Sequence, residues 1–116
     1  MGYDPRALAS VDDLLALDVR VGTIVSAQVL RGARTPCFAL VISFGELGRK
    51  TAAAVISDLY ETDDLVGLQV VAAVNVAAET VAAVLSEVRV LTVDDGKGSR
   101  VLLIPERPVP DGGRLS

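Results

Sequence analysis

Residues 17–29 read LDVRVGTIVSAQV and decide the fold class, because apolar and polar side chains alternate along them. One parity is apolar apart from a single threonine and holds Leu17, Val19, Val21, Thr23, Val25, Ala27 and Val29. The other parity carries Asp18, Arg20, Gly22, Ser26 and Gln28. This alternation predicts a long, half-buried β-strand whose buried face carries the apolar parity.

A second alternating run follows a charged turn. Residues 31–36 read RGARTP, and beyond them Phe38, Leu40, Ile42 and Phe44 share one face. The sequence therefore predicts two long strands joined by a loop that carries Arg31 and Arg34.

The order of the remaining elements indicates the fold. Residues 50–56 predict a third strand, and residues 61–67 predict a short helical turn that Thr62 or Asp63 would cap and Gly67 would end. Apolar runs at 68–76 and 87–93 predict two more strands. Three strands, a short helix and two strands predict an all-β fold, a five-stranded Greek-key OB barrel with short helices and terminal extensions.

Extensions flank the predicted barrel, which spans residues 17–94. Residues 1–16 predict a helical arm in which Val11, Leu14 and Leu15 form an apolar edge, and Ser10 and Asp13 have capping-box spacing. Residues 95–116 predict one additional strand at 100–104 and an irregular tail, whose prolines exclude a helix or a central strand.

Six segments of the chain together resemble a known family. They read LDVRVGTI (17–24), FGELG (44–48), DLVG (64–67), VN (74–75), SEV (86–88) and RPVPDG (107–112). The chain resembles the CsaA-type, secretion-associated chaperones, which belong to the wider group of tRNA-binding OB domains. The resemblance covers about residues 14–115 and implies a homodimer that binds unfolded or precursor polypeptide.

The composition agrees with a subunit interface. Of the 116 residues, 51% are apolar and the mean hydropathy is +0.48, which is high for a small monomeric barrel. By resemblance, the tail with Pro108, Val109 and Pro110 packs at the dimer interface.

Several function classes are disfavoured by residues that the chain lacks. It has no histidine and one cysteine, Cys37, so we expect neither a zinc site nor a thiolate–imidazole pair. The segment DDGKG at 94–98 predicts a hairpin turn and lacks the spaced oxygen ligands of an EF-hand. No nucleophile elbow is present. The sequence predicts no catalytic residue, no metal, no cofactor and no enzyme activity.

We also expect no targeting signal. Its longest uncharged stretch, 65–78, is too short and too polar to cross a bilayer, and the N-terminus has no basic start or apolar core of a signal peptide. We expect a cytoplasmic protein that does not insert into membranes.

OB barrels bind ligands on the face of strands 2 and 3, between the loops that follow strands 1 and 4. Family members usually have Ser-Ser-Ala-Gln where this chain has AAAV at 52–55, so this polar strip has become apolar. An extended apolar peptide fits such a strip better than phosphate does. The predicted peptide-binding residues are Ala53, Val55, Asn75 and Ser86.

The same face would also meet nucleic acid. The candidate phosphate contacts are Arg31, Arg34, Arg49 and Lys50, whereas the loop at 76–84 has no basic residue and one acid. The net charge of −4, the pI of about 4.7 and the scarcity of aromatic residues predict weak tRNA binding that fades with salt. Two alternatives to the chaperone therefore remain, a tRNA-binding module and a dimeric interaction module that has lost its ancestral ligand.

Overall fold

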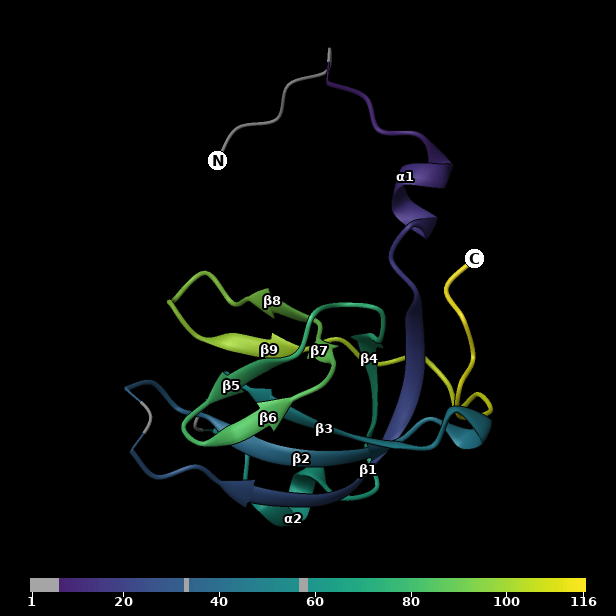
Figure 1. The fold of residues 1–116 in the computed structure, drawn as a ribbon. Helices are drawn as coiled ribbons and strands as arrows, with labels where there is room; N and C mark the ends of the chain where they lie inside the picture. The colour runs from purple at the N-terminus through teal and green to yellow at the C-terminus, as the bar shows by residue number, and fades with distance from the viewer. Residues whose placement is uncertain (1–6, 33, 57–58) are drawn as a thin grey trace.

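The computed structural model describes residues 7–32, 34–56 and 59–116. The expectations placed on residues 1–6 of the arm, including the absence of a signal peptide, lie outside these residues. The first four strands are β1 (Val19–Val29), β2 (Phe38–Ser43), β3 (Arg49–Ala54) and β4 (Gln69–Ala73). With β7 (Arg89–Val90) they form an antiparallel sheet in the order β3-β2-β1-β4-β7, which curls into a nearly closed barrel (Figure 1). The predicted OB-fold class is thus confirmed.

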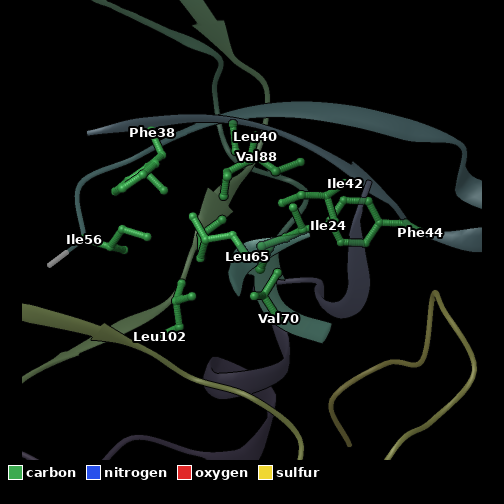
Figure 2. Close-up of a cluster of buried hydrophobic side chains, with 14 residues drawn as sticks. Ile24, Phe38, Leu40, Ile42, Phe44, Ile56, Leu65, Val70, Val88 and Leu102 are labelled. Carbon is green, nitrogen blue, oxygen red and sulfur yellow. The ribbon is translucent and has the colours of Figure 1, made fainter. Parts of the chain in front are cut away.

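Alternation in β2 follows the prediction. Phe38, Leu40 and Ile42 are each at most 4% exposed, and Phe44, just beyond the strand, is fully buried. A short 3₁₀ turn, η1 (Gly45–Leu47), then connects β2 to β3. Figure 2 shows these four side chains together in the core with Ile24, Leu65 and Val70.

The predicted parity of β1 is wrong in the middle of the strand. Gly22 and Ile24 are buried there, although their parity carries the polar residues. Ile24 pairs with Ile42 and Ser26 pairs with Val41, so Val25 has no partner in β2. This β-bulge reverses the parity, and Ala27 packs against the core on its far side.

The short helix α2 (Thr62–Leu65) forms where it was predicted, but its cap differs. Glu61, and neither Thr62 nor Asp63, occupies the N-cap position, and its N–H donates to the Asp64 carboxylate. Gly67 follows the last turn with φ of +91°, a left-handed conformation that ends helices. Leu65 is the helical residue that enters the core.

The predicted fifth strand is divided between two sheets. The Leu91 N–H donates to Val71 of β4, whereas the Leu91 carbonyl accepts from Leu103. The chain thus leaves the barrel after β7 and continues as β8 (Thr92–Asp94), which pairs with β9 (Arg100–Leu102). The predicted hairpin turn at 94–98 is confirmed, because the Asp94 and Asp95 carboxylates accept backbone N–H groups of the turn.

One hairpin was not predicted. The segment treated as a loop at 76–84 contains β5 (Glu79–Val81), which pairs with β6 (Val84–Ser86). The turn residues Ala82 and Ala83 both have positive φ, at 48° and 68°. Such turns normally use asparagine and glycine, and the two alanines therefore carry no turn signal.

The two extensions behave differently. Helix α1 (Val11–Leu15) has the predicted Ser10–Asp13 capping box, buries no residue and stands away from the barrel (Figure 1). The C-terminal tail instead runs along β1, where Leu115 N–H donates to Val19 and Val21 exchanges backbone hydrogen bonds with residues 112 and 113. The tail therefore pairs with the beginning of β1, on the same edge of that strand that pairs with β2 from Thr23 onward.

Gly22 provides a test of this packing. A Cβ at this position would lie 2.6 Å from the Ile42 side chain and 2.8 Å from the Phe44 ring. We expect Gly22→Ala to destabilise the fold by about 1–3 kcal/mol, because a packed core resists an added methyl group. Urea unfolding measures the change, with exposed Gln28→Ala on the same strand as the control. An unchanged midpoint in Gly22→Ala would contradict this packing.

Candidate functional site

The end of β6 and the residue after it close the barrel against β3. The Glu87 carboxylate accepts the Thr51 N–H at 3.0 Å, and the Glu87 N–H donates to the Thr51 carbonyl at 2.9 Å. Ser86 Oγ accepts the Ala53 N–H at 3.0 Å and donates to the Val88 carbonyl. The Thr51 hydroxyl lies 2.6 Å from the Leu85 carbonyl. We call this group of contacts the seam.

Glu87 is ionised in the seam under ordinary conditions. The Thr51 N–H, the Thr51 hydroxyl at 3.0 Å and, to a smaller degree, the charge of Lys50 lower the pKa of the Glu87 carboxyl. A carboxylate that accepts such donors is stabilised in its charged form. The seam therefore requires the deprotonated acid.

Beyond the seam, β3, the β5–β6 hairpin and the chain from β7 to β9 surround a cavity of about 310 Å³. Its apolar wall consists of small side chains and includes Ala53, Val55, Val76, Ala77 and Val81. Its polar lining residues are Glu79, Ser86, Arg89, Thr92 and Arg100. This volume suits a short segment of a ligand rather than a folded domain.

Three of the four predicted peptide-binding residues line this cavity. Ala53 and Val55 are half-buried, while Ala52 and Ala54 between and beside them are in the core. Ser86 also lines it, but its hydroxyl is already used in the seam. Peptide binding by these residues stays a prediction.

Asn75 is placed elsewhere. Its side-chain oxygen accepts the Asp18 N–H at 2.8 Å, and its side-chain amide donates to the Ala16 carbonyl at 2.9 Å. Asn75 thus ties the start of β1 to the end of β4 and is not among the residues that line the cavity.

The four predicted phosphate contacts do not form one patch. Arg31 and Arg34 lie in the β1–β2 loop, next to the end of the β2–β3 ladder where Phe38 pairs with Ala54. Arg49 and Lys50 begin β3 at the opposite end of that ladder. The five residue steps along β2 separate the two pairs by roughly 17 Å.

Two arginines that the sequence analysis did not select, Arg89 and Arg100, line the cavity. Arg89 is the exposed residue between buried Val88 and Val90, which was a usable signal for a surface position. Its nearness to Arg100 depends on how the barrel closes, and strand alternation carries no information on that.

The predicted interface residues of the tail contact their own barrel. The Gln69 side chain accepts the Val109 N–H and donates to the Val109 carbonyl, at 3.1 Å and 2.7 Å. The Thr23 hydroxyl donates to the Asp111 carboxylate at 2.6 Å. Pro108, Val109 and Pro110 are exposed on the outer side, so their role at a dimer interface stays a prediction.

Cys37 is buried directly before β2, and burial raises the pKa of its thiol. The thiolate is therefore scarce at neutral pH, and Cys37 behaves as a small core residue.

Comparisons with known proteins identify the family. Residues 19–114 match the model of a putative tRNA-binding domain. Chaperone CsaA from Bacillus anthracis is 43% identical, with a TM-score of 0.87 over 95% of this chain and 100% of that one. The chain belongs to the CsaA-type tRNA-binding OB-fold family.

Other relatives agree with this assignment. The CsaA chaperone protein of Picrophilus torridus is 31% identical, with a TM-score of 0.84 over 94% of this chain and 100% of that one. Methionine–tRNA ligase of Methanothrix thermoacetophila is 35% identical over 87% of this chain, which corresponds to 14% of the ligase. The chain thus spans about one seventh of the curated relatives it matches, and the matched part is a binding domain.

No helix in the described part of the chain combines the length and apolar character that a membrane crossing requires.

The seam predicts a dependence on pH. The lowered pKa of Glu87 means that its contribution to stability is complete above the ordinary glutamate pKa of about 4.3 and is lost as pH falls through the lower, folded-state value. We expect Glu87→Gln to reduce the stability at pH 7 and to lose less stability on acidification than the unmodified protein does. Thermal unfolding between pH 3 and pH 7 measures both effects. Exposed Glu46→Gln is the control, and an identical acid response in the Glu87 variant would contradict the role of the seam.

Proposed function

We propose that this chain is a non-catalytic, cytoplasmic, CsaA-like chaperone that holds segments of unfolded or precursor polypeptide, including proteins destined for secretion. The cavity beside the seam carries this proposal. Its wall of alanine and valine side chains offers apolar contact to a polypeptide segment, and Ala53 and Val55 remain half-buried there. Similarity to chaperone CsaA over that protein's whole length supports it.

Transfer-RNA binding is the second candidate, and the family model favours it. The two exposed arginines of the β1–β2 loop, Arg31 and Arg34, are the contacts proposed for phosphate. Arg49 and Lys50 begin β3 at the far end of the ladder, and a phosphate backbone would have to span both ends of it. The net charge of −4 weakens such binding at long range.

A salt series separates the two ligands. We expect a labelled unfolded peptide to bind with little dependence on salt, because apolar contact supplies most of its affinity, and labelled tRNA to bind weakly and to dissociate as salt rises. Val55→Gln should weaken peptide binding about tenfold, since burying a valine contributes about 1.5 kcal/mol. Fluorescence anisotropy measures both ligands.

The matched control is Val29→Gln, an exposed valine at the end of β1 that does not line the cavity. Tight tRNA binding at physiological salt that is lost when Arg31 and Arg34 are both changed to glutamate would favour the RNA-binding function. Binding of neither ligand would favour the interaction module.

We further propose that the chain forms a homodimer. Leu8, Val11 and Leu14 on the N-terminal arm are 80%, 68% and 56% exposed, and apolar side chains so exposed on one short segment favour a protein interface. Val109 on the tail adds a further exposed apolar side chain.

Sedimentation velocity tests this assembly. We expect a dimer at micromolar concentration that dissociates on removal of residues 105–116 and, more specifically, in Val109→Asp, which keeps the backbone bonds to Gln69. Val11→Asp should have the same effect from the arm. Val29→Asp, also exposed, serves as the control, and a monomeric unmodified protein would refute the proposal.

A further inference from the structure

Two arginines at the cavity have no partner among the described residues. Arg89 and Arg100 both line the cavity, and neither makes an ion pair or a side-chain hydrogen bond within the described chain. Arg20 lies 2.7 Å from the Asp18 carboxylate, and Arg107 is paired with Glu106. The exposed Arg31, Arg34 and Arg49 also have no ion pair within the described chain, but they do not line the cavity. The two guanidinium groups at the cavity are therefore available to a ligand.

The lining of the cavity has the opposite charge to the whole chain. Among the described residues that line it, two arginines stand against one acid, Glu79, whereas the chain carries a net charge of −4. Arg100 also has Asp94 as its cross-strand neighbour, but no ion pair joins them. A ligand in the cavity thus meets local positive charge beside the small apolar wall.

We propose that Arg89 and Arg100 select polypeptide segments in which an aspartate or glutamate lies next to small apolar residues. This inference rests on the proposed polypeptide-binding function and names the class of segment that is bound. Guanidinium groups bind carboxylates through paired, charge-assisted hydrogen bonds. Arg89 is the first residue of β7 and Arg100 is the first residue of β9, so the backbones of both arginines are fixed relative to the cavity.

The cavity favours a carboxylate of a peptide over the phosphates of RNA. The described residues that line it include no aromatic side chain, so they offer bases no stacking surface. The small apolar wall matches alanine or valine side chains of a peptide. Only two of the lining residues that the structure describes are cations that could contact a phosphate backbone. RNA binding at this site is therefore the alternative that the experiment must separate from peptide binding.

Three labelled peptides test the selection on the full chain. They share one alanine–valine core and carry glutamate, glutamine or lysine at the flanks. We expect the glutamate peptide to bind about fivefold more tightly than the glutamine peptide, as for an exposed ion pair, and the lysine peptide to bind most weakly. The preference should shrink with salt, while the affinity of the glutamine peptide should not.

Variants assign the selection to the two arginines. Arg89→Gln and Arg100→Gln should each reduce the preference, and the double variant should bind the glutamate and glutamine peptides equally. Arg89→Lys, which keeps the charge, should retain part of the preference. Lys97→Gln is the control, because this exposed cation in the β8–β9 turn is not among the cavity residues. Thermal unfolding of each variant verifies that the fold is intact.

Four outcomes would overturn the inference. Equal binding of all three peptides, or tighter binding of the lysine peptide, refutes the selection but leaves polypeptide binding intact. A preference that persists in the double variant assigns it to other residues. If no peptide binds, while a single-stranded RNA binds and is lost in the double variant, the proposed function fails together with this inference.

Discussion

Closure of the barrel along the outer edge of β3 is the constraint on which the site depends. Buried N–H groups on a strand edge need acceptors, and here Glu87 and Ser86 supply side-chain oxygens to Thr51 and Ala53. Because side chains bridge this edge, β3 and β6 do not form a continuous backbone ladder. The space beyond Ala53 stays open, and the cavity lies there. The contacts that close the fold therefore also define where a ligand fits.

The strands β1 to β4 were predictable from the sequence because each of them carries its own hydrophobic signal. Phe38, Leu40 and Ile42 alternate strictly, and their burial follows that alternation. In β1 the alternation is interrupted at Thr23 and Ile24, where a polar residue on the apolar parity is followed by an apolar residue on the polar parity, just before the bulge at Val25. A bulge depends on how two strands pair, and one strand's sequence does not record its partner's register.

The β5–β6 hairpin shows a second kind of failure. Its turn places Ala82 and Ala83 in left-handed conformations, which cost energy for residues other than glycine. Contacts of the strands with β3 hold the turn in this form, as the bond from the Thr51 hydroxyl to the Leu85 carbonyl illustrates. Tertiary contacts therefore override the local preference, and the local sequence alone predicted a loop.

The candidate site was predictable only where it lies on regular strands. Ala53 and Val55 were found because the altered strip at 52–55 lies on the expected binding face of an OB barrel, whereas Arg89 and Arg100 come from separate elements that meet only after closure. Asn75 was selected as a ligand contact, yet both ends of its amide bind backbone groups of the chain itself. A polar residue in a family motif can be retained for the fold as readily as for a ligand.

Local and overall charge act over different distances in this protein. At physiological ionic strength, interactions between exposed charges are screened beyond about 8 Å, so the net charge of −4 acts mainly on the approach of a ligand. A group inside the cavity instead meets Arg89, Arg100 and Glu79 at contact distance. The net charge of the surface therefore repels an approaching polyanion such as RNA. Inside the cavity, the two arginines attract a single carboxylate. A short acidic peptide satisfies both conditions, because it carries few charges to be repelled and places one of them beside the arginines.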